Sequence, residues 1–87
     1  MDHLMDGFLT LKTRDEVYHF LEDLCTINEL EAMKQRFQVA GMLREEKTYQ
    51  DIAKETGAST ATISRVNRAL TYGTDGYDTV LDRLDQK

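Results

Sequence analysis

Apolar residues recur with the 3.6-residue period of an α-helix along almost the whole chain. Near the N-terminus, Leu4, Phe8 and Leu11 follow an i, i+4, i+7 pattern, and comparable stripes return in every later segment. The chain has no proline and only five glycines, so few residues interrupt these stripes. We therefore expect an all-α fold with six helices and short connections. The predicted helices span about residues 3–11, 14–24, 27–45, 49–55, 59–71 and 77–85.

Three of the predicted helices begin at a threonine. Thr13 is followed three residues later by Glu16, and Thr26 by Glu29, which is the spacing of a capping box. In each box the hydroxyl accepts from the third helical amide while the carboxylate reaches back to the cap. A weaker version begins at Thr48. These signals indicate where the second, third and fourth helices start.

The segment from Thr48 to Leu70 has the pattern of a helix-turn-helix. Gly57 suits the left-handed residue that ends the first helix, because glycine has no Cβ to clash there. Ser59 is then a good N-cap for the second helix. The residues expected to pack inward are Ile52, Ala53, Ala58, Ile63, Val66 and Leu70. Spacing and residue type agree at all these positions, so we predict a helix-turn-helix here.

The outward face of the second helix is short, polar or basic, and no acidic residue occurs between Gly57 and Thr74. Small side chains let a helix enter the major groove, hydroxyls bond bases or phosphates, and arginine pairs with guanine or phosphate. We therefore predict a DNA-reading helix. The predicted DNA-binding residues are Thr48, Gln50, Lys54, Ser59, Thr60, Ala61, Ser64, Arg65 and Arg68.

The overall charge argues against DNA binding, but its distribution does not. Eleven basic and sixteen acidic residues give a net charge of −5. Residues 36–72 hold six basic and four acidic residues, so the acidic excess lies in the flanking helices. Affinity for DNA depends on local phosphate contacts rather than on the global sum. Because few basic residues are available to contact phosphates, we predict that DNA affinity depends only modestly on salt.

Composition narrows the other function classes. No apolar run approaches the roughly 20 residues that span a bilayer, and the acidic start of the chain is unlike a secretory signal, so we expect a cytoplasmic protein with no membrane partner. One cysteine, Cys25, and two histidines cannot build a structural zinc site. No catalytic constellation is visible. We expect no enzyme activity, no metal and no cofactor.

The stretch TGASTATISRVNRAL (residues 56–70) resembles the Trp repressor family, and FLEDLCTINELEAMKQR (residues 20–36) is similar to that family's core helices. The resemblance covers about residues 14–84. Within the family it looks closest to the Trp repressor-related YerC/YecD proteins, through DLCTINE, GASTATISR and the following Ala-Leu-Thr-Tyr-Gly. It implies an intertwined helical dimer with one helix-turn-helix reading head per subunit, which represses transcription by binding an operator.

The resemblance also suggests a ligand site between the core and the reading head. In the tryptophan-sensing members two arginines sandwich the indole ring, and these correspond to Arg36 and Arg65. Two threonines that help position the ligand correspond to Thr26 and Thr62. These four residues are the candidate ligand-binding set.

Two departures from the family pattern make tryptophan doubtful as an effector. The serine that holds the ammonium group of tryptophan corresponds to Ala69, and a glycine beside the indole corresponds to Val66. Losing a hydrogen bond to a charged ligand costs about 1.5–3 kcal/mol, or at least tenfold in affinity. The branched Val66 side chain would also intrude into the ligand space. The sequence therefore identifies no effector.

The N-terminal helix is too apolar to stay in water, and a chain of 87 residues offers it only a small core. We therefore predict one domain, 1–87, that forms a homodimer. Its dimer core comprises residues 1–45 and is completed by residues 77–85, while residues 48–71 form the reading head. The predicted function is a DNA-binding transcriptional regulator, a repressor, on a pseudo-palindromic operator. The alternative is a dimeric adaptor or ligand sensor that binds a protein partner rather than DNA.

Overall fold

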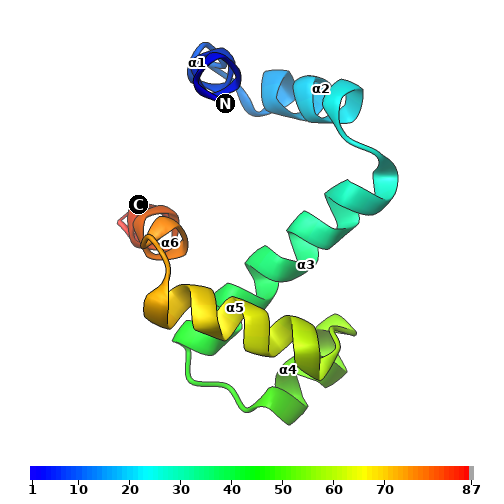
Figure 1. Cartoon of the computed structure of the whole chain (residues 1–87), viewed down its shortest axis with the longest axis vertical. Coiled ribbons are helices and arrows are strands. Elements are labelled where there is room, and N and C mark those ends of the chain that lie inside the picture. Colours follow the sequence, from blue (N-terminus) through cyan, green and yellow to red (C-terminus); the bar gives the residue numbers. More distant parts are fainter. Residues whose placement is uncertain (87) are drawn as a thin grey trace. The chain divides into compact units, whose positions relative to one another are not determined.

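The computed structural model describes residues 1–86, and within that range it contains α-helices and no β-strand. The helices are α1 (Asp2–Leu9), α2 (Arg14–Leu24), α3 (Ile27–Arg44), α4 (Tyr49–Thr56), α5 (Thr60–Tyr72) and α6 (Gly76–Asp85). The predicted all-α class and its six helices are confirmed (Figure 1). The chain divides into two compact units, Met1–Glu31 and the part from Ala32 onward, with the boundary inside α3.

No apolar side chain of the first unit is fully buried. Phe8 of α1 packs edge-to-face on Phe20 of α2, with ring centroids 5.1 Å apart and an interplanar angle of 77°. Neither α1 nor α2 contains a fully buried residue. Leu9 is 83% exposed. The contact between the two aromatic rings therefore joins α1 to α2 without burying any residue of either helix completely.

The first helix ends two residues before the predicted Leu11. The Thr10 hydroxyl donates to the Gly7 carbonyl at 2.7 Å, and the Thr10 amide donates to the same oxygen. Leu11 donates to the Phe8 carbonyl, again three residues back. Hydrogen bonds to the carbonyl three residues back close the last turn and end the α-helical hydrogen-bond pattern. The apolar periodicity of the sequence therefore extends beyond the end of the helix.

The two predicted capping boxes differ in the structure. At α3, Thr26 and Glu29 form the complete box, because the Glu29 amide donates to the Thr26 hydroxyl and the Thr26 amide donates to the Glu29 carboxylate. These bonds from Thr26 lower the pKa of Glu29. At α2 the Thr13 hydroxyl accepts from the Glu16 amide as predicted, but the Glu16 carboxylate accepts from the Lys12 amide instead of the cap's own. The Glu16 carboxylate therefore binds the backbone one residue before the cap, in the connection between α1 and α2.

The second unit has an apolar core shared by three helices and one turn. Figure 1 shows α5 (yellow) crossing the C-terminal half of α3 (green), with α4 beside it. The fully or almost fully buried residues are Val39, Ala40, Met42, Ile52, Ala58, Ile63 and Val66. Burying the larger of these side chains is worth about 1.5–3 kcal/mol each. This core holds the helix-turn-helix on α3.

An ion-pair cluster joins the end of α3 to α6. The Arg44 guanidinium lies 2.5 Å from the Asp82 carboxylate and 3.5 Å from the Asp78 carboxylate. It also donates to the Asp78 carbonyl. The hydrogen bond to Asp82, followed by the nearby negative charges, raises the pKa of Arg44. This cluster fixes α6 after the turn that follows α5.

Glu46 occupies a backbone conformation that suits glycine. Its φ of 62° lies in the left-handed region, at the C-terminal end of α3. Glu46 donates to the Leu43 carbonyl and Lys47 donates to the Met42 carbonyl, the bond pattern of a Schellman motif. The residue in the left-handed position of this motif is usually glycine.

We expect Glu46→Gly to raise the free energy of unfolding by about 0.5–1 kcal/mol, because it removes the steric cost of a Cβ at this φ. Urea denaturation measures the change. Glu46→Ala is the control, since it removes the carboxylate but keeps the Cβ and should give no comparable gain. A Glu46→Gly variant no more stable than the original chain would show that the left-handed residue is not strained.

Candidate nucleic-acid interface

The predicted helix-turn-helix is present, with its turn residues in the predicted conformations. Gly57 has φ 73° and ψ 6°, and its amide donates to the Ala53 carbonyl at 2.9 Å, which closes α4. Ser59 is the N-cap of α5, and its hydroxyl accepts from the Thr62 amide at 3.1 Å. Ile63 and Val66 then turn inward from α5 onto Ile52 and the other core residues. The turn thereby fixes which face of α5 is presented to solvent.

The outer face of α5 carries most of the predicted DNA-binding residues. Thr60, Ala61, Arg65 and Arg68 are exposed, whereas Ser64 is half-buried. Positions 60, 61, 64, 65 and 68 share one side of a helix because they lie about one turn apart. Within residues 1–86 neither arginine forms an ion pair. Both guanidiniums are therefore available to an external anion.

The first helix of the motif contributes a more mixed surface. Thr48 is the N-cap of α4, and its hydroxyl accepts from the Asp51 amide. Gln50 and Lys54 are exposed, as predicted for DNA contacts. Lys54 lies with Lys47, Met42, Asp51 and Glu55 around a hollow of about 440 Å³. The two carboxylates offset the two ammonium groups, so α5 rather than α4 carries the local positive charge.

One exposed residue near the basic face was missed by the sequence analysis. Tyr72 is 83% exposed and lines a hollow of about 310 Å³ with Arg65, Arg68, Ala69 and Gly73. Its position seven residues after Arg65 was the available signal, because that spacing returns to the same helix face. An aromatic side chain thus ends the basic stripe of α5.

The four candidate ligand residues are placed in different settings. Thr26 belongs to the first unit and its hydroxyl caps α3. Arg36, in the second unit, is half-buried on α3. Thr62 and Arg65 lie on α5, where the Thr62 hydroxyl accepts from Ser59 at 3.1 Å. Val66, the predicted intruder, is 1% exposed and belongs to the core. The hydroxyls of Thr26 and Thr62 therefore both take part in hydrogen bonds at the start of their helices.

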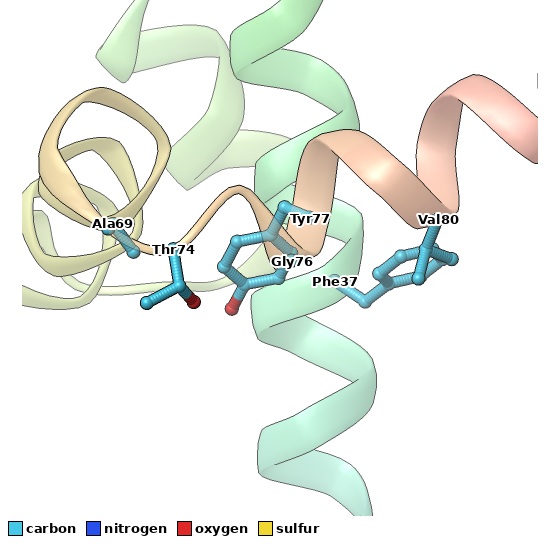
Figure 2. A pocket seen from close by; sticks show the side chains of 7 residues that line it. Phe37, Ala69, Thr74, Gly76, Tyr77 and Val80 are labelled. Carbon is cyan, nitrogen blue, oxygen red and sulfur yellow. The ribbon is translucent and has the colours of Figure 1, made fainter.

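A second feature of this unit is an apolar groove between α3 and α6, which we call the α3–α6 groove (Figure 2). It has a volume of about 520 Å³. Figure 2 shows Phe37 of α3 beside Val80 of α6, with Tyr77 and Thr74 further along. The residues that line it are Phe37, Ala69, Gly73, Thr74, Gly76, Tyr77 and Val80. A Cβ on Gly73 would collide with the Ala69 carbonyl oxygen, so this wall depends on glycine.

Metal clusters and membrane-spanning helices are both absent from the described part of the chain. Across residues 1–86, no cluster of three or more histidine, cysteine, aspartate or glutamate side chains could hold a metal ion. None of the helices in that range combines the length and apolar character required to span a membrane. The exposed basic face of α5 is the candidate site.

The helix-turn-helix packs on the core of the second unit, and its second helix contains no acidic residue. These two features are typical of DNA-binding helix-turn-helix proteins. The chain belongs to the Trp repressor family, because the family model for the Trp repressor protein matches residues 1–85. This family consists of regulatory DNA-binding proteins rather than enzymes. The resemblance inferred from the sequence is therefore confirmed.

Individual relatives agree with this assignment. The chain is 55% identical over 86 residues to YerC of Bacillus subtilis (strain 168), described as an uncharacterized protein, with 99% of this chain and 83% of the relative covered. It superposes on the crystal structure of a TrpR-like protein from Eubacterium eligens ATCC 27750 with a TM-score of 0.93 and 62% identity, covering 97% of this chain and 87% of that one. A Trp repressor-like protein of Staphylococcus aureus gives the same TM-score, 0.93, at 51% identity, with 99% and 86% covered.

Proposed function

We propose that this protein is a sequence-specific transcriptional regulator, a repressor, that binds a pseudo-palindromic operator as a homodimer in the cytoplasm. The observation that carries the proposal is the exposed face of α5, which begins at a capped N-terminus and holds two unpaired arginines without any acidic neighbour in the segment. Thr60, Ala61 and Ser64 lie where a helix entering the major groove meets base edges. Arg65, Arg68, Lys54 and Thr48 lie nearer the phosphates, and Gln50 reaches a base or a phosphate from α4.

The dimer part of the proposal rests on apolar surface that the single chain leaves uncovered. Leu9 and Ile27 are exposed to 83% and 79%. The α3–α6 groove adds Phe37 and Val80, which are also more than a third exposed. The α3–α6 groove is a contiguous apolar surface, and such a surface marks an interaction site. A second copy would cover it and would place two reading heads about one helical turn apart.

Selection of bound fragments from genomic DNA, followed by gel shift on the enriched sequence, tests this function. We expect an enriched site with two related half-sites, bound in the presence of competing heparin. Because few cations face the duplex, log affinity should fall against log salt with a slope of only about −3 to −6 for the dimer. A slope near zero, or selection that enriches no sequence, would contradict DNA reading through α5.

The protein-binding alternative is favoured by one observation, the acidity of the first unit. Residues 1–31 contain eight acidic and two basic side chains. Such a surface would repel DNA and suit a basic protein partner. The gel shift separates the two candidates, since an adaptor of this kind would leave every DNA fragment unshifted at physiological salt.

We expect L-tryptophan not to be the effector of this protein. Ala69 offers no hydroxyl to a ligand ammonium group, which costs at least tenfold in affinity. Val66 is 1% exposed and belongs to the same core cluster as Ile52 and Ile63, so an indole could occupy its position only by displacing core side chains. Isothermal titration calorimetry checks this, and micromolar binding of L-tryptophan would overturn it.

A further inference from the structure

The turn of the helix-turn-helix is held by side-chain hydrogen bonds as well as by apolar packing. The Thr56 hydroxyl donates to the Ile52 carbonyl at 2.7 Å and accepts from the Ala58 amide at 3.1 Å. One hydroxyl therefore satisfies a carbonyl before the turn and an amide after it. This leaves the carbonyl of Thr56 itself, which as the last residue of α4 has no partner within the helix.

A side chain from α3 supplies that partner. The Gln35 carboxamide nitrogen donates to the Thr56 carbonyl oxygen at 3.2 Å, across 21 positions of sequence. Both groups are partly buried. A polar group removed from water is costly to leave unpaired, so this bond is worth more than an exposed one. Gln35 thus ties the end of α4, and with it the turn, to the helix on which the reading head sits.

Gln35 is a polar residue on the side of α3 that packs on the core. It lies four residues before Val39 and seven before Met42, on the face of α3 that faces the core, and both of those residues are buried. A leucine or methionine there would extend the apolar core. Apolar packing has no preferred direction, whereas a hydrogen bond fixes the distance and angle between its two groups. A glutamine at this site therefore adds orientation rather than burial.

We propose that Gln35 is a positioning residue that sets the orientation of the reading head, α4 and α5, relative to α3. The proposal rests on the proposed function for its consequence, because a dimer reads two half-sites only when both heads are held at the matching angle. A shift of about 1 Å at a recognition surface is enough to weaken its contacts. Gln35 touches no DNA in this scheme and acts through Thr56.

Paired variants on the same helix test the role. Gln35→Met keeps the length of the side chain and removes the donor, and Gln38→Met makes the same change at an exposed position three residues later. At a temperature where both are fully folded, we expect Gln35→Met to bind the selected operator about three- to tenfold more weakly than Gln38→Met. Affinity for random DNA should be equal, since neither change alters charge. Equal operator affinity in the two variants would overturn the proposal.

A measurement without DNA keeps this test independent of the proposed function. Residual dipolar couplings of backbone amides report the orientation of α4 and α5 relative to residues 32–44 of α3. We expect Gln35→Met to change these couplings and Gln38→Met to leave them as in the unsubstituted protein. Unchanged couplings in Gln35→Met would refute the positioning role. Changed couplings in a protein that selects no DNA would support it while refuting the regulator.

A second pair covers the case in which the methionine variant does not fold. Gln35→Glu and Gln38→Glu each add one negative charge to α3, so their general electrostatic effect on DNA is matched. Only Gln35→Glu brings a carboxylate against the Thr56 carbonyl, where two acceptors repel each other. A larger loss of operator affinity and a larger change in couplings for Gln35→Glu are expected. Identical behaviour of the pair would count against the proposal.

Discussion

Replacing both Arg65 and Arg68 by alanine is expected to reduce affinity for the selected operator at least a hundredfold. A homodimer loses four guanidiniums in this variant. Each bidentate arginine contact to a base contributes about 1–3 kcal/mol, and each lost phosphate contact reduces the magnitude of the salt slope by about one. Quantitative gel shifts at several salt concentrations measure both effects.

The same double variant should keep its free energy of unfolding within about 1 kcal/mol of the original value. Both arginines are exposed, and neither forms an ion pair in the described residues. Arg14→Ala with Arg83→Ala is the matched control, because it removes the same charge from exposed positions on α2 and α6. Unfolding of the Arg65/Arg68 variant would make those arginines structural. An equal loss of binding in the control would make the effect one of net charge.

The reading head could be predicted from the sequence because its signals are local. Gly57 at a left-handed turn and Ser59 at a helix start each depend on the backbone of a few neighbouring residues. Ile52, Ile63 and Val66 follow simple helical spacing and are all buried. Fold class and motif placement were therefore accessible without any knowledge of distant contacts.

The buried face of the third helix could not be predicted equally well. Helical spacing alone puts one stripe of this helix at Leu30, Met33, Phe37, Ala40 and Leu43. Ala40 is buried and Leu43 packs against the core, but Met33 and Phe37 are 37% and 38% exposed, and Val39 and Met42 are also buried. These last four residues, two exposed and two buried outside the stripe, all belong to the unit that begins at Ala32, so the difference lies in which side of α3 the other helices of that unit cover. The choice of face depends on which helices return to pack on it, and periodicity does not encode that choice.

Two polar features depend on contacts that sequence spacing does not reveal. The bond from Gln35 to Thr56 joins positions 21 residues apart and involves a backbone carbonyl, so no residue pattern announces it. The clamp of Arg44 on Asp78 and Asp82 spans 34 and 38 positions. By contrast, the Thr26–Glu29 box lies within one helical turn and was predictable in full.

Placing a charge in the α3–α6 groove is expected to dissociate the proposed dimer. Val80 is 47% exposed in the single chain, so Val80→Asp should fold with the same helical content. In a dimer that covers the groove, however, the new carboxylate would be buried without a partner, at a cost of several kcal/mol. We expect at least a hundredfold weaker dimer affinity, measured by analytical ultracentrifugation at micromolar protein.

Thr79→Asp is the control for this experiment, because it adds the same charge at an exposed neighbouring position of α6 that does not line the groove. It should remain dimeric. If Val80→Asp were equally dimeric, the groove would not be the interface. A monomeric unsubstituted protein would remove the dimer altogether, and with it the paired reading heads, because a single head with few cations cannot supply the affinity that operator recognition needs. The oligomeric state therefore tests whether the exposed apolar surface, as a dimer interface, and the acid-free α5, as the DNA-reading helix, act together.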